Sequence, residues 1–137
     1  MDRALNYLAL ARKAGLLELG EEPVGAAARA NHARLVVVAS DASDHTWRRA
    51  KSFVAGTDQQ CLRLPYPKTE MGLATGRQEL AIAAMTDPAM ALALVNALGQ
   101  PEKHKAVTEA LQTKADRAKK RQSEAKAHKR NVRKGKK

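Results

Sequence analysis

Residues able to do nucleophilic or acid–base chemistry are few in this chain of 137 residues. Ser43, Asp44 and His45 are the three residue types of a hydrolytic triad, but they are consecutive. Neighbours in sequence point in different directions, so they cannot form the chain of nucleophile, base and orienting group that such catalysis needs. Helix capping and solvation account for these side chains better. We therefore predict no catalytic residue and no enzymatic activity.

Groups that could hold a metal ion or a nucleotide are also sparse. The four histidines are scattered, and a single cysteine, Cys61, cannot complete a Cys/His ligand set or an internal disulfide. Gly72 and Gly76 are four residues apart, but the peptide between them lacks the Lys and Ser/Thr of a phosphate-binding loop. We predict no metal and no cofactor. The two glycines are interpreted as turn and close-packing positions, and Cys61 as a small buried hydrophobe rather than a reactive thiol.

Charge is distributed very unevenly along the chain. The whole sequence has 25 Lys and Arg against 14 Asp and Glu, a formal net charge of +11. Residues 113–137 contain 12 of these bases and only two acids, a net of +10, whereas residues 1–112 contain 13 bases and 12 acids, a net of +1. A cluster of Lys and Arg releases counterions from nucleic acid whatever its sequence, so this segment favours a polyanionic partner. A solubilising extension is the alternative interpretation.

The C-terminal segment has little to bury, since Val132 is the only large aliphatic residue after Leu111. Such a segment cannot offset the entropy of ordering by forming a core. Pro101 suits the first turn of a helix, and Val107, Leu111 and residues 115 and 118 form a thin apolar stripe. We predict a domain at residues 1–100. A polybasic tail should follow at residues 101–137, helical at first, fraying near residue 120, and disordered beyond that until a partner binds.

Composition excludes several other classes of protein. The aromatic residues are one Trp, two Tyr and one Phe, too few for a surface that stacks several bases. The most apolar region, residues 80–98, contains Thr86, Asp87, Pro88 and Asn96, which disfavours a membrane span. The N-terminal residues show no convincing signal-peptide pattern. With one cysteine, these features predict a cytoplasmic protein, monomeric when free and with no membrane partner.

Strands and helices are expected to alternate over the first hundred residues. Helices are expected from about residue 4 to Gly15, from Pro23 at a first helical position to about Asn31, from the cap at residues 40–43 to Gly56, over residues 68–75 up to Gly76, and from Asp87 to Gly99. Short strands are expected at residues 16–19, 35–39, 61–64 and 80–85. The run at 35–39 is apolar on both faces, as in a central strand covered by helices. The predicted fold class is α/β, a three-layer α/β/α sandwich around one small mixed sheet.

The helix expected before Gly56 has one face made of Trp47, Ala50 and Val54 and another made of Arg48, Arg49 and Lys51. Apolar residues at this spacing are typical of the core face of an amphipathic helix. We therefore place Trp47 in the core, with a partly exposed contact as the alternative.

The order of these elements and three short motifs resemble the large-subunit ribosomal protein L-seven-Ae family of kink-turn RNA binders, in particular its small bacterial members. The motifs are Gly20-Glu21-Glu22 at the start of a helix, residues 33–43 as strand, acidic loop and helix start, and residues 71–77, Met-Gly-Leu-Ala-Thr-Gly-Arg. The resemblance covers roughly residues 4–99 and excludes the basic tail.

The resemblance implies an α/β/α sandwich that holds RNA at one end, through the loop that opens the second helix and the loop before the short glycine-containing helix. It therefore assigns RNA-binding residues in two loops of the body. The charge pattern adds a third group in the tail. The predicted RNA-binding residues are Gly20, Glu21, Glu22, Val24 and Arg29; Pro65, Tyr66, Pro67 and Lys68; and Lys119, Lys120, Arg121, Lys129, Arg130, Arg133 and Lys134.

The three polar positions that read a kink-turn differ from the family pattern. Aligned on Gly20, the family's Asn, Glu and Lys become Glu22, Pro23 and Ala26. Glu22 repels phosphate, Pro23 has no donor or acceptor side chain, and Ala26 removes a phosphate contact. The resemblance thus implies an RNA-facing edge with altered kink-turn readers.

Two functions follow from these observations. The first is a non-catalytic RNA-binding protein associated with the ribosome or another structured RNA, in which the tail adds affinity. The second is a protein-interaction module of the same fold, anchored to nucleic acid by its tail. Binding of the tail-less domain to structured RNA would distinguish them.

Overall fold

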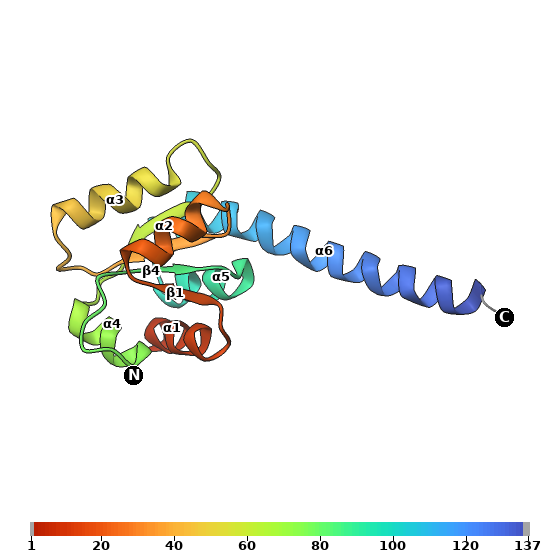
Figure 1. The fold of residues 1–137 in the computed structure, drawn as a ribbon, viewed down its shortest axis with the longest axis horizontal. Helices are drawn as coiled ribbons and strands as arrows, with labels where there is room; N and C mark the ends of the chain where they lie inside the picture. Colours follow the sequence, from red (N-terminus) through yellow and green to blue (C-terminus); the bar gives the residue numbers. More distant parts are fainter. Residues whose placement is uncertain (1, 136–137) are drawn as a thin grey trace.

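The computed structural model describes the backbone of residues 2–135 and the side chains of residues 2–125 (Figure 1). Its centre is a four-stranded sheet with the order β1-β4-β2-β3. The strands are β1 (Leu17–Leu19), β2 (Leu35–Val38), β3 (Gln60–Arg63) and β4 (Ile82–Met85). β2 and β3 are parallel, whereas β4 is antiparallel to both β1 and β2. The sheet is therefore mixed, as predicted.

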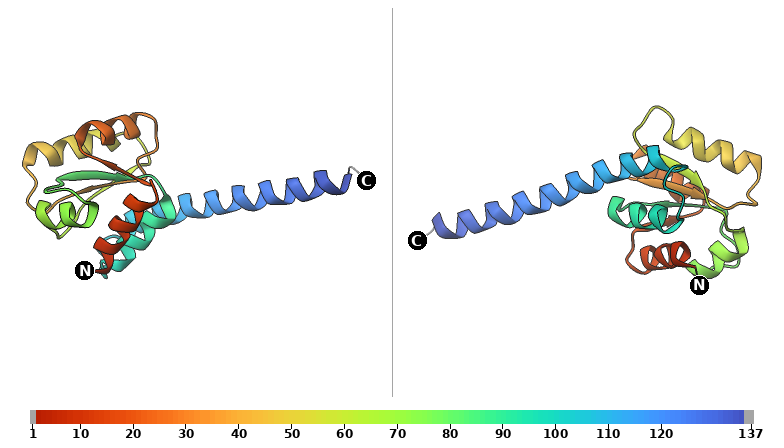
Figure 2. Two further views of the ribbon diagram at one scale, coloured as in Figure 1. Left: turned by 60° about the horizontal axis from the view of Figure 1, so that its bottom comes forward. Right: turned by 180° about the vertical axis from the view of Figure 1, so that it is seen from behind.

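Helices cover both faces of this sheet (Figures 1 and 2). α2 (Glu21–Arg29) and α3 (Asp44–Val54) lie on one face. α1 (Arg3–Lys13) and α5 (Pro88–Ala97) lie on the other, and α4 (Lys68–Thr75) packs against α1. α6 (Lys105–Gly135) packs its first turns on α5 and then projects from the body. The predicted α/β/α sandwich is confirmed.

The two central strands form the middle of the core. Every residue of β2 and of β4 is buried. Their register sets Val36 and Val37 opposite Ala84 and Ala83, so branched side chains pair with small ones across the strands. β2 is covered on both faces, as its uninterrupted apolar run predicted, and β4 has the same character.

Helix boundaries agree with the capping residues. Ser43 Oγ accepts from Thr46 N–H, Asp87 Oδ2 accepts from Met90 N–H, and Gly76 ends α4 in the left-handed conformation. The first residues of two helices differ from the prediction. Pro23 is the third rather than the first residue of α2, and residues 101–104 form turns, so the final helix begins at Lys105 instead of Pro101. The helix then continues to Gly135, beyond residue 120, where fraying was expected.

Trp47 is partly exposed, which is the alternative prediction, and is not enclosed in the core. Trp47 and Val54 are half-buried, and only Ala50 is buried on α3. Cations border the indole ring, with the Arg63 guanidinium carbon 5.1 Å and the Lys51 ammonium 5.6 Å from a ring centroid. Helical spacing identified the apolar face correctly, but long basic side chains cover part of it.

Candidate nucleic-acid interface

The loop that opens α2 depends on a glycine. Gly20 caps the helix with φ 95° and ψ 163°, a conformation that residues with a Cβ rarely adopt. Its N–H donates to the carbonyl oxygen of Ile82 at 3.0 Å, which fixes the loop to the start of β4. Nη1 of Arg77 lies 3.9 Å from the position that a Cβ would take at Gly20.

The loop before α4 is fixed by three hydrogen bonds. The N–H of Ser40 donates to the Tyr66 carbonyl at 2.8 Å, and the N–H of Lys68 donates to Asp41 Oδ1 at 2.8 Å. The N–H of Leu80 donates to the Lys68 carbonyl at 3.0 Å. This loop is thereby tied to the carboxyl end of β2 and to the segment that enters β4.

The two loops meet at the entry to β4, since Leu80 bonds to one loop and Ile82 to the other. We call the surface formed by residues 20–23, 65–68 and 77–79 the loop edge. Its two predicted loops come from sequence positions more than forty residues apart, and the structure places them at the same end of the sheet (Figure 1).

Arg77 is placed on the loop edge by the glycines of α4. A Cβ at Gly72 would lie 2.7 Å from the Arg77 carbonyl oxygen, and the Arg77 N–H donates to the Gly72 carbonyl at 2.8 Å. Gly76 has φ 80°, which turns the chain at the end of the helix. The predicted turn and close-packing roles of Gly72 and Gly76 are confirmed. Arg77 was missing from the predicted site residues, although the motif that ends Gly76-Arg77 included it.

The predicted residues of the two loops differ in exposure. Glu22, Pro23 and Pro65 are exposed, and Glu21, Pro67 and Lys68 are half-buried, whereas Val24 and Tyr66 are buried beneath the loops.

Tyr66 supports its loop from below. Its hydroxyl donates to Asp2 Oδ1 at 2.6 Å. Burial, with the bond to Asp2, raises the pKa of Tyr66 above its ordinary value, and the same bond lowers the pKa of Asp2.

Charge on the loop edge is mixed rather than cationic. Glu21 forms an exposed ion pair with Arg49 at 2.6 Å, and the Arg49 guanidinium carbon lies 4.8 Å from the centroid of the Phe53 ring. Lys68 and Arg77 are bases of this edge, and Glu22 and Glu79 are acids. Such a surface can offer backbone groups and shape to a ligand, but little net attraction for phosphate.

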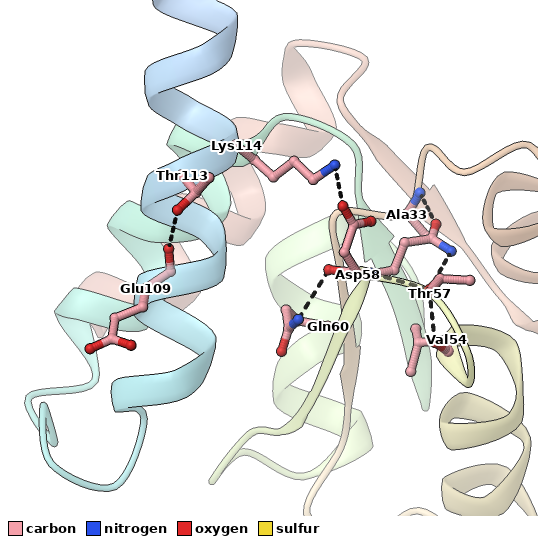
Figure 3. A network of polar contacts seen from close by, with 9 residues as sticks. Ala33, Val54, Thr57, Asp58, Gln60, Glu109, Thr113 and Lys114 are labelled. Atoms are coloured by element: carbon pink, nitrogen blue, oxygen red, sulfur yellow. Dashed lines mark hydrogen bonds and ion pairs between the residues drawn. The ribbon is translucent and has the colours of Figure 1, made fainter.

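The first turns of α6 are attached to the body. Leu111 is 1% exposed and Val107 is half-buried. Lys114 Nζ lies 2.5 Å from Asp58 Oδ2 in the turn before β3 (Figure 3). This bond lowers the pKa of Asp58 below its ordinary value, with desolvation opposing and the charges of Lys114 and Arg34 contributing.

The predicted basic residues therefore lie away from the loop edge. Asp58 precedes β3, whereas the loop edge follows the carboxyl ends of the parallel strands β2 and β3, so α6 leaves from the opposite end of the sheet (Figures 1 and 2). Lys119, Lys120 and Arg121 are exposed on α6. The side chains of Lys129, Arg130, Arg133 and Lys134 are outside the described residues.

Arg29 belongs to the α6 end of the body as well. It ends α2, one helix length from Gly20, and its Nη1 lies 3.3 Å from the position of a Cβ at Gly25. The predicted RNA-binding residues thus form two groups at opposite ends of the domain, not one surface.

Among residues 2–125, no group of three or more His, Cys, Asp or Glu side chains is arranged to hold a metal ion. No helix in the described part is long and apolar enough to cross a membrane. Cys61 is half-buried, and burial raises the pKa of its thiol, which keeps it protonated.

Two solved structures are similar to this chain in fold. No protein-family model and no curated protein matches the sequence. A solved structure of a protein of unknown function from Bacillus halodurans has a TM-score of 0.68 and 24% identity, and the match covers 73% of this chain and 100% of that chain. An RNA-binding protein of 15.5 kD from Giardia lamblia has a TM-score of 0.54 and 17% identity, with 75% and 85% covered. The chain shares its α/β/α fold with these proteins.

Proposed function

We propose that this protein binds structured RNA, ribosomal or of another ribonucleoprotein, without catalysing a reaction. The observation that carries the proposal is the concentration of a net charge of +10 in residues 113–137. This segment begins inside α6 (Lys105–Gly135), a helix that is docked to a nearly neutral body. Phosphate contacts supply most of the affinity of such proteins and little of their specificity. The body shares its fold with an RNA-binding protein, which supports RNA as the polyanion.

The loop edge would supply selectivity. Its glycine-capped loop and the loop before α4 present a fixed shape, but Glu22, Pro23 and Ala26 are all exposed where the resembling family carries its kink-turn readers. We therefore expect this edge to recognise RNA shape through backbone groups, Lys68 and Arg77, and to discriminate poorly in favour of a standard kink-turn.

The test compares the full chain with a chain ending at Ala125, which keeps Leu111 and Lys114 and loses seven Lys and Arg. Both should bind a labelled RNA hairpin in fluorescence anisotropy. If half of the lost bases touch phosphate, the log–log salt slope should fall by roughly 2 to 3 in the shorter chain. Failure of the full chain to bind any structured RNA at 0.15 M salt would contradict the proposal. Sequencing of RNA cross-linked to the protein in cells would identify the partner.

A protein partner is the second candidate, favoured by one exposed apolar side chain. Leu73 on α4 is 77% exposed and borders a shallow hollow of about 510 Å³ with Asp2, Leu5 and Glu70. Leu73→Ser should abolish such an interaction and leave RNA affinity unchanged. If the chain ending at Ala125 binds no RNA above the background of an uncharged control protein, this second function is preferred for the body.

A further inference from the structure

An open groove of about 540 Å³ lies between the end of α2 and the exposed face of α6. One wall is formed by Asn31 and Arg34, which join α2 to β2. The other wall belongs to α6 and contains Lys114, Arg117, Lys120, Arg121 and Glu124. We refer to these seven residues as the basic groove. Five bases and one acid line it, and none of them belongs to the loop edge.

We propose that the basic groove binds the phosphate backbone of an RNA duplex, as a second site independent of the loop edge; this rests on the proposed RNA-binding function. A flexible polybasic tail would attract RNA without any fixed geometry. The basic groove differs because it includes a residue of the body, Arg34, and because both of its walls are held in place.

The α6 wall is held by packing and by an ion pair. Leu111 is buried one turn before Lys114, and Lys114 reaches Asp58 on the body. Figure 3 shows this contact, with the Gln60 side chain donating to the Asp58 carbonyl at 3.0 Å. The direction of α6 beside the body is therefore fixed at the level of the groove.

The wall that carries Arg34 is held by a buried glutamine. Gln59 Oε1 accepts from the N–H of Ala33 at 2.9 Å, and its Nε2 donates to the Ala28 carbonyl at 3.2 Å. Asn31 turns the chain at the end of α2 with φ 61°. These bonds fix the segment between α2 and β2 against the turn that contains Asp58, so both walls share one support.

Positive charge in the groove is only partly neutralised within the described residues. Asp58 pairs with Lys114 and also contributes negative charge near Arg34. Arg34 Nε is buried and has no hydrogen-bond partner among the described side chains. Arg117, Lys120 and Arg121 are exposed, and the ion pairs found among residues 2–125 include none of them. The basic groove is therefore suited to an anionic ligand.

The spacing and chemistry of the lining favour a duplex backbone over other anions. Lys114 and Arg121 are seven residues apart, which is about 10 Å along a helix axis. A nucleic-acid duplex presents roughly six phosphates over that length. Arginine forks suit phosphate oxygens, and no aromatic side chain is present to stack a single-stranded base. No apolar side chain lines the groove either, whereas the centre of a protein interface is usually apolar.

The experiment measures binding of the full chain to a 20-base-pair RNA duplex of unrelated sequence by fluorescence anisotropy over a salt series. Arg34→Gln should lower the log–log salt slope by about 1 and weaken binding about fivefold at 0.15 M salt. The exposed triple variant Arg117→Gln, Lys120→Gln, Arg121→Gln should lower the slope by roughly 2 to 3 and weaken binding on the order of 100-fold.

Matched controls remove the same charge elsewhere. The control for Arg34→Gln is the single variant Arg12→Gln. The control for the triple groove variant is a second triple variant, Arg12→Gln, Lys13→Gln, Lys105→Gln. All three control residues are exposed and lie outside the groove. Each control should change affinity by less than about twofold, since charges beyond a Debye length are largely screened. Thermal unfolding is measured for every variant. If Arg34→Gln does not fold, the exposed triple decides.

Two results would overturn the inference. The groove variants could match their controls while the wild type still binds RNA, in which case the proposed function stands without this site. Poly-glutamate of equal charge could compete as well as the duplex, which would indicate an acidic protein partner. Absence of any RNA binding by the wild-type chain would instead remove the proposed function and this site with it.

Discussion

Leu111→Ala tests whether α6 is an integral part of the folded domain. The residue lies beyond the predicted boundary at residue 100, yet its side chain is 1% exposed and belongs to the buried core, on a helix that packs against α5. Removing three carbons from a fully buried leucine costs about 2–5 kcal/mol, because the lost transfer free energy and the cavity both count. Against a total stability of about 5–15 kcal/mol this is a large fraction.

Urea unfolding followed by Trp47 fluorescence measures the effect, because Trp47 is the single tryptophan and lies on α3 rather than on the mutated helix. Val107→Ala is the matched control, a half-buried residue one turn earlier whose truncation should cost about 1 kcal/mol. Hydrogen exchange of residues 105–114 gives the local readout. If Leu111→Ala changed the free energy of unfolding by less than about 0.5 kcal/mol, or if exchange in α6 rose with no change in the body, α6 would be a separate unit and its docking would be wrong.

Three further outcomes are expected. Gly72→Ala should destabilise the domain by roughly 1–3 kcal/mol in thermal unfolding, since its Cβ would meet the backbone of Arg77 at 2.7 Å; an unchanged melting temperature would refute the close approach. Burial lowers the pKa of His104 below its ordinary value of 6.5, so the unfolded state binds more protons than the folded state as the pH falls below that value. The free energy of unfolding should therefore decrease as the pH drops from 7 to 5, and it should decrease less in His104→Gln. The triple change Glu22→Asn, Pro23→Glu, Ala26→Lys should raise the affinity for a kink-turn RNA, relative to a plain duplex, by at least roughly tenfold in a competition assay, because each restored contact is worth about 1–3 kcal/mol. Equal affinities for the two RNAs would show that the loop alignment on Gly20 is shifted.

Local signals predicted most of the fold. Asp87 before Pro88, Ser43 three residues before Thr46, and Gly76 each set a helix boundary through bonds within one turn, so the sequence contains all the information needed. The apolar run of β2 likewise reports its own burial. These elements could be placed without knowing what lies beside them.

Features that depend on a neighbouring element could not be placed in this way. The start of α6 is set by burial of His104 and Leu111 on the body, and this outweighed the preference of Pro101 for a first turn. Trp47 lies on the correct face of α3, but Arg63 from β3 covers its ring, which no helical period can predict. The place of Arg34 in the lining of the basic groove depends on α6 passing close to it, although Arg34 and Lys114 are eighty residues apart in the sequence.

The separation of the two candidate RNA surfaces has a physical consequence for recognition. The loop edge carries bases and acids in similar number, so it adds little to the long-range field, whereas α6 carries the excess charge at the other end of the sheet. If the chain binds RNA as proposed, electrostatic attraction orients the first encounter through α6 and the basic groove, and this stage is the salt-dependent one. The loop edge acts at short range, where shape and backbone hydrogen bonds decide how long the complex persists. In that case Glu22, Pro23 and Ala26 give no kink-turn discrimination at one end, and the attraction at the other end is unaffected. On this proposal, substitutions in one glycine-capped loop change the RNA target, while a helix at the opposite end of the sheet maintains the general affinity for RNA.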